Sequence, residues 1–158
     1  MVRPMRAVQV FLAATALVLI GAVEAAASAR QLAAQAGRGR PTLSGEGAAL
    51  TLAGLALSVA VYLVLGRAVG RSGGRERTAV AEGVASGILA GAVGGSVRAL
   101  AVSDYLGEQV ARFGLPAELA FASLVVFVAG AIVASAIGGG ALTWLGFRLS
   151  SRSPRPPP

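Results

Sequence analysis

Apolar residues fall into four long runs along the chain, and each run is long enough to cross a membrane. Crossing about 30 Å of hydrocarbon takes about 20 helical residues. The runs cover residues 7–27, 48–66, 80–102 and 118–147. Between them, polar residues, glycine and proline gather in short segments that are typical of loops. The pattern predicts an all-α, polytopic integral membrane protein whose four transmembrane helices form two hairpins.

Arginine is distributed unequally between the two sides of this predicted bundle. One side carries Arg3, Arg6, Arg67, Arg71, Arg75, Arg77, Arg148, Arg152 and Arg155. The other side carries Arg30, Arg38, Arg40 and Arg112. Because short loops rich in arginine stay on the cytoplasmic side, both termini are expected to be cytoplasmic. We expect a multi-pass protein of the plasma (inner) membrane of a bacterium.

The first apolar run has two interpretations. Its basic start, its apolar centre and the small residues 27–29 fit a secretory signal that is cleaved after residue 29. The length of the apolar part instead favours a retained anchor helix, which is the interpretation we prefer. Beyond this run, the helix is expected to continue for about two turns before Gly37 and Pro41 end it.

Two shorter segments complete the predicted organisation. Residues 104–113 are expected to form a short interfacial helix that lies flat on the outer surface between the third and fourth spans, because their apolar residues share one helix face. That face consists of Tyr105, Leu106, Val110 and Phe113. Residues 148–158 are basic and rich in proline, which predicts a disordered cytoplasmic tail. The remainder, residues 1–147, is expected to be a single transmembrane domain.

The composition excludes most catalytic chemistry. Apolar residues make up 55% of the 158 residues and charged residues 13%, whereas about one quarter of the residues in soluble domains are charged. The chain contains no Cys, His, Lys or Asn, and Asp104 is its only aspartate. Cysteine nucleophiles, thiolate metal sites, histidine bases and Schiff-base lysines are therefore impossible. We expect a protein that is not an enzyme and that binds no metal, cofactor or nucleic acid.

The third span carries the most specific pattern in the chain, a glycine at every fourth position. This glycine ladder consists of Gly83, Gly87, Gly91 and Gly95. It reduces one helix face to backbone, so that another helix can approach closely, as in a glycine zipper. The fourth span offers a second face of small residues, made of Gly130, Ala134 and Gly138. The ladder predicts tight helix packing, either within one chain or between chains.

Three charged residues fall at membrane depth, where ionised groups are costly and mark functional sites by default. Glu24 and Arg98 lie near the outer ends of the first and third spans, so they are expected to form an ion pair between these helices. Glu82 lies 16 residues before Arg98, about 24 Å along a helix, which excludes a contact between the two. We expect Glu82 near the inner surface, within reach of Arg67 or Arg71.

Two functions remain open at this point. The first is an accessory or assembly protein, in which the ladder packs within the chain, against a second copy or against another membrane protein, and the charges fix the assembly. The alternative is a proton- or ion-coupled transporter of small solutes that uses Glu24 as its protonatable site. Membrane lipids are expected partners in either case.

Overall fold

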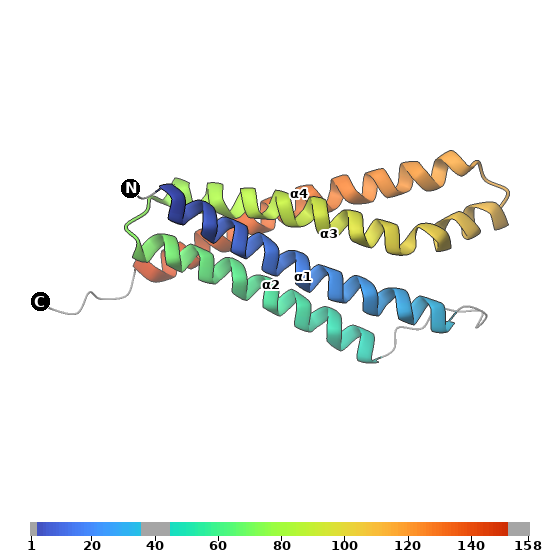
Figure 1. The fold of residues 1–158 in the computed structure, drawn as a ribbon, viewed down its shortest axis with the longest axis horizontal. Coiled ribbons are helices and arrows are strands. Elements are labelled where there is room, and N and C mark those ends of the chain that lie inside the picture. The colour runs from blue at the N-terminus through green and yellow to red at the C-terminus, as the bar shows by residue number, and fades with distance from the viewer. Residues whose placement is uncertain (1–2, 36–44, 152–158) are drawn as a thin grey trace, which may run out of the picture.

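The computed structural model describes residues 3–35 and 45–151 of the chain. They form four helices: α1 (Arg3–Gln35), α2 (Gly45–Arg71), α3 (Glu76–Arg112) and α4 (Ala117–Ser151) (Figure 1). This part of the chain contains no strand. Each helix includes a stretch that is long and apolar enough to cross a membrane. The all-α class and the four candidate membrane spans are therefore confirmed.

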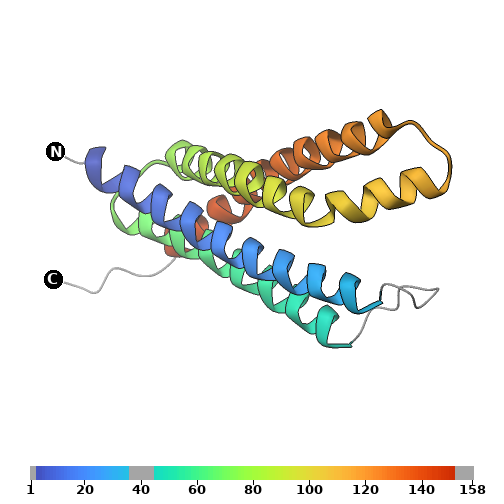
Figure 2. The same cartoon turned by 45° about the vertical axis from the view of Figure 1, so that its right-hand side comes forward.

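Consecutive helices run in opposite directions, as both ribbon views show (Figures 1 and 2). α1 and α3 begin, and α2 and α4 end, at the same end of the bundle. We call it the Arg-rich end, because the arginines that flank these helix ends are Arg67, Arg71, Arg75, Arg77 and Arg148. α3 packs mainly on α4, α2 packs on α4, and α1 packs on α2 and α3. Toward the far end, the α1–α2 pair diverges from the α3–α4 pair (Figure 2).

The helices extend beyond the predicted spans. α1 continues to Gln35, in agreement with the expected extension, while Gly37 and Pro41 lie outside the described residues. α1 is unbroken through residues 27–29, and its retention or cleavage remains a prediction. α4 continues to Ser151, so the first residues of the predicted tail are helical. Residues 152–158 lie outside the described residues.

The interfacial helix expected at residues 104–113 is not a separate element. α3 runs without a break from Glu76 to Arg112. No proline interrupts this stretch, and Gly107 keeps a negative φ. The hydroxyl of Ser103 donates a 2.8 Å hydrogen bond to the carbonyl of Leu100, a bond within the helix that leaves its backbone intact. An amphipathic pattern alone does not end the helix that precedes it.

Two glycines with positive φ end α2 and α3. Gly73 has a φ of 69° and Gly114 a φ of 66°, the left-handed region in which a side chain is strained. After α3, the N–H of Leu115 donates a 3.0 Å hydrogen bond to the carbonyl of Val110, as in a Schellman motif. The turn after α2 is closed in the same way. These turns allow α3 and α4 to return along their neighbours.

Candidate functional site

The glycine ladder of α3 packs against α4 of the same chain. A Cβ atom at Gly91 would lie 2.7 Å from the Cα atom of Ile132 and 2.8 Å from the carbonyl oxygen of Ala131. These are backbone atoms that cannot move aside singly, so glycine is required for this approach. The other ladder contacts are Gly83 with Gly139 and Thr143, Gly87 with Ser135, and Gly95 with Ala131. Over the described residues, the ladder is thus engaged by the chain's own fourth helix.

The small residues that the sequence singles out on α4 do not make this contact. A Cβ atom at Gly130 or Gly138 would meet nothing within 4 Å, and Ala134 is exposed. The α4 face that meets the ladder is displaced by one position and consists of Ala131, Ser135, Gly139 and Thr143. Because a helix has 3.6 residues per turn, a displacement of one residue rotates the face by about 100°. Spacing alone does not distinguish two adjacent faces of this kind.

A second close contact joins α2 to α4 near the Arg-rich end. A Cβ atom at Gly66 would lie 2.8 Å from the backbone nitrogen of Phe147, and one at Gly146 would lie 2.9 Å from the Cα atom of Leu63. This contact was not predicted from the sequence. Its signal is the spacing of Gly66 and Gly70, which are four residues apart like the glycines of the ladder. Together with the ladder, this contact closes the Arg-rich half of the bundle.

All four helices line a cavity of about 240 Å³ in the middle of the bundle. Leu17, Tyr62, Ala90 and Leu142 form its end nearer the Arg-rich side, and Glu24 and Arg98 lie at the opposite end. Gly94 and Gly138 also line the cavity, and a Cβ atom at either would meet nothing within 4 Å. At these two positions, glycine leaves the space open. Gly138 is thus a cavity residue in this structure.

Glu24 and Arg98 form an ion pair in the wall of this cavity. The Arg98 guanidinium donates a hydrogen bond to Oε2 of Glu24. The Glu24 side chain is 16% exposed and the Arg98 side chain 43%. The Glu24 carboxylate lies directly against Gly54 of α2, where a Cβ atom would overlap it. The pair therefore connects α1 to α3, and Gly54 provides the room for it on α2.

The structure buries Glu82, which the sequence places near the inner surface. Its residue surface is 9% exposed. It lies six residues after Glu76, the first residue of α3, or about 9 Å along the helix. The next residue of α3, Gly83, lies against Gly139 and Thr143 of α4. The hydroxyl of Ser86 donates a 2.9 Å hydrogen bond to the Glu82 carbonyl, so this buried serine bonds to its own helix.

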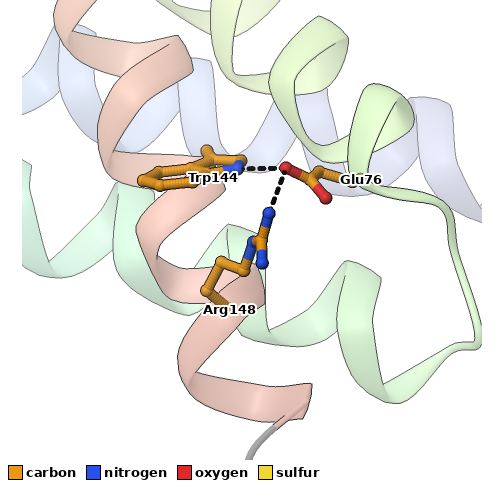
Figure 3. A network of polar contacts seen from close by, with 3 residues as sticks. All are labelled: Glu76, Trp144 and Arg148. Carbon is orange, nitrogen blue, oxygen red and sulfur yellow. Dashed lines mark hydrogen bonds and ion pairs between the residues drawn. The ribbon is translucent and has the colours of Figure 1, made fainter.

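A cluster of three polar side chains joins the start of α3 to the end of α4 (Figure 3). The carboxylate of Glu76 accepts hydrogen bonds from the indole N–H of Trp144 and, at 3.0 Å, from the guanidinium of Arg148. The guanidinium carbon of Arg148 lies 5.3 Å from the centre of the Trp144 ring, within the range of a cation–π contact. This cluster was not predicted from the sequence, although the start of α3 and the end of α4 lie at the same end of the bundle.

Two side chains at the cavity, Glu24 and Arg98, can exchange a proton or bind an ion. Glu24 can take up and release a proton, and Arg98 can hold an anionic group. No group of three or more His, Cys, Asp or Glu side chains that could hold a metal ion occurs among residues 3–35 and 45–151.

No protein-family model, curated protein or solved structure matches the chain.

Proposed function

We propose that the protein is a non-enzymatic transporter of small anionic solutes that couples their movement to a proton carried by Glu24. The supporting observation is the Glu24–Arg98 ion pair in the wall of a cavity lined by all four helices. Acidic and basic side chains within a membrane bundle mark the pathways of substrates and protons. A cavity of about 240 Å³ suits a small organic or inorganic ion.

The charges of Glu24 and Arg98 determine how proton binding is coupled to anion binding. When Glu24 is ionised, its charge and that of Arg98 cancel. A proton on Glu24 leaves the Arg98 charge uncompensated, which is costly within an apolar bundle. A monovalent anion in place of the Glu24 carboxylate restores neutrality, since a guanidinium binds carboxylates through paired hydrogen bonds. One proton and one monovalent anion are therefore expected to load the site together.

Among the described residues that line the cavity, none besides Glu24 and Arg98 adds a charge to this balance. α2 contributes Gly54, which lies against the carboxylate, and the phenol of Tyr62 farther along the cavity. α3 contributes Arg98, and the α4 residues that line the cavity, among those described, have no ionisable side chain. Proton uptake in the cavity is thus assigned to Glu24.

We further propose that two helical hairpins cross the plasma membrane of a bacterium with both termini cytoplasmic. The support is the concentration of arginines at the Arg-rich end, because basic loops stay on the cytoplasmic side. In this orientation, the Glu24–Arg98 end of the cavity is the one nearer the outer surface.

The transport proposal is tested in vesicles that contain the purified protein and an internal pH-sensitive dye. Sodium pyruvate, sodium nitrate and the sulfate salt of choline, which contains no monovalent anion, are added separately outside. We expect the two anions to drive proton entry in the wild type, choline to drive none, and Glu24→Gln to abolish the anion-driven entry. Equal proton entry in Glu24→Gln and wild type, or none with either anion in the wild type, would contradict the proposal.

An accessory or assembly role is the second candidate. It is supported by the outer part of α4, where Gly130 and Ala134 are exposed and a Cβ atom at Gly130 would meet nothing within 4 Å. A helix of a second copy or of another membrane protein could approach this face closely. Vesicles in which neither anion drives proton entry would favour this role over transport.

A further inference from the structure

A second hollow lies at the Arg-rich end, separate from the cavity that holds Glu24. It is an open groove of about 800 Å³ between the start of α3 and the last turns of α4. Residues of the first turns of α3 and of α4 near Trp144 line it. It has no lining residue in common with the central cavity. A role for this groove therefore does not depend on transport.

The groove has an apolar wall and a basic rim. The wall consists of Val80, Ala81, Gly140 and Ala141, and the rim of Arg75 and Arg77. Both arginines are exposed. Glu76 lies between them in sequence, but its carboxylate is engaged by Trp144 and Arg148. The two rim charges are thus not cancelled by the carboxylate beside them.

Two members of the polar cluster in Figure 3, Glu76 and Trp144, line one side of the groove. Trp144 is 39% exposed, its indole N–H is held by Glu76, and the Arg148 guanidinium faces its ring. Tryptophan is enriched at the level of lipid headgroups, where one part of its ring system is apolar and another is wet. A ring held in this orientation can flank a lipid at the membrane surface.

We propose that this groove binds one anionic phospholipid, with the phosphate at Arg75 and Arg77 and an acyl chain along the wall of Val80 and Ala81. Charge complementarity selects the occupant, since two exposed guanidiniums border an apolar surface at the end of membrane-spanning helices. The N-terminus of α3 adds donors at the same place, because Arg75 makes no side-chain capping hydrogen bond there. A lipid is the ligand that supplies both an anionic group and an apolar chain.

The proposal is tested by native mass spectrometry of the full chain in detergent, with phosphatidylglycerol or phosphatidylcholine of identical acyl chains. The wild type should prefer phosphatidylglycerol by about thirtyfold, as expected for two basic residues near a lipid surface. Arg75→Gln combined with Arg77→Gln should remove the preference. Arg112→Gln, which changes an exposed arginine at the far end, should retain it.

A substitution that keeps every charge distinguishes lipid binding in the groove from general electrostatic attraction to the arginines. Ala81→Trp fills the groove, so it should weaken phosphatidylglycerol binding while all arginines remain. Ala141→Trp fills it from α4 and serves as a second variant if the first does not fold, as judged by circular dichroism. Equal binding of the two lipids by the wild type, or unchanged binding in a folded groove-filling variant, would overturn the proposal. Displacement of the lipid by inorganic phosphate would also overturn it, because it would indicate a site for free phosphate.

Discussion

Replacing Gly91 with alanine is expected to lower the free energy of unfolding by about 1–3 kcal/mol, the usual cost of inserting a methyl group into a packed contact. The new Cβ atom would lie 2.7 Å and 2.8 Å from backbone atoms of Ile132 and Ala131. α3 and α4 would have to separate along the ladder to relieve this overlap. The loss is expected even though alanine favours a helix more than glycine does. Unfolding in mixed micelles of increasing SDS content, followed by circular dichroism, measures the change.

Gly94→Ala is the matched control for this prediction. It is the same substitution in the same helix, three positions farther along, and a Cβ atom at Gly94 would meet nothing within 4 Å. Its gain in helix propensity should leave the stability unchanged or slightly raised. If Gly91→Ala and Gly94→Ala unfold at the same SDS content, the tight α3–α4 contact is not what holds these helices together.

Removing one member of the Glu24–Arg98 pair is expected to destabilise the bundle more than removing both. Each single variant, Glu24→Gln or Arg98→Gln, leaves a charge without its partner, at a cost of about 1–3 kcal/mol after allowance for the exposed part of Arg98. The double variant leaves no charge and should unfold closer to the wild type. The same SDS titration, analysed as a double-mutant cycle, gives the coupling energy.

The exposed pair at the Arg-rich end provides the comparison. Glu76 and Arg148 have side chains that are 44% and 50% exposed, and exposed ion pairs contribute about 0–1 kcal/mol. The cycle of Glu76→Gln and Arg148→Gln should therefore give a smaller coupling energy than that of Glu24 and Arg98. A double variant of Glu24 and Arg98 that loses the sum of the two single effects would show that the two residues do not interact.

The existence of the four spans could be predicted from sequence because it depends on local composition and length. The contact between Glu24 and Arg98 could also be predicted, because consecutive spans that alternate in direction place the ends of the first and third helices at the same depth. The structure brings the two side chains together there. Depth along the bundle thus follows from counting residues. Neither the spans nor this depth depends on how the helices are rotated about their axes.

Rotation about the helix axes is what the sequence did not determine. The contact face of α4 lies one position away from Gly130, Ala134 and Gly138, because two neighbouring faces of this helix are both made of small residues. The burial of Glu82 likewise depends on which side of α3 is covered by its neighbours. A weakly amphipathic helix with small residues on several faces does not define its own orientation.

The end of α3 illustrates a different limit. Residues 104–113 have an amphipathic pattern that suits a surface helix, and the same pattern is compatible with the last turns of a longer helix. A separate surface helix would require a residue that ends the preceding helix before it. The first residue after 102 at which the backbone leaves the helical conformation with a positive φ is Gly114. The boundary is therefore set by the turn that follows and not by the apolar pattern.

The glycines of the chain perform two opposite tasks in this bundle. Those of the ladder, with Gly66 and Gly146, bring helices into backbone contact and close the Arg-rich half. Gly94 and Gly138 instead leave the central cavity open. The transport proposal depends on this second group, because a charged pair can exchange protons and solutes only where water reaches it.

Access of water to the central cavity is tested most directly by cysteine labelling, since the natural chain has no cysteine. Ser135→Cys places a thiol in the cavity wall, and Ala134→Cys places one on the exposed face of α4 at the same depth. A charged methanethiosulfonate reagent, added to both sides of vesicles, reacts with the thiolate, which forms only in contact with water. We predict rapid modification of Ser135→Cys, slowed by pyruvate, and little modification of Ala134→Cys. Equal modification of the two variants, or none of Ser135→Cys, would contradict a hydrated cavity around Glu24 and Arg98.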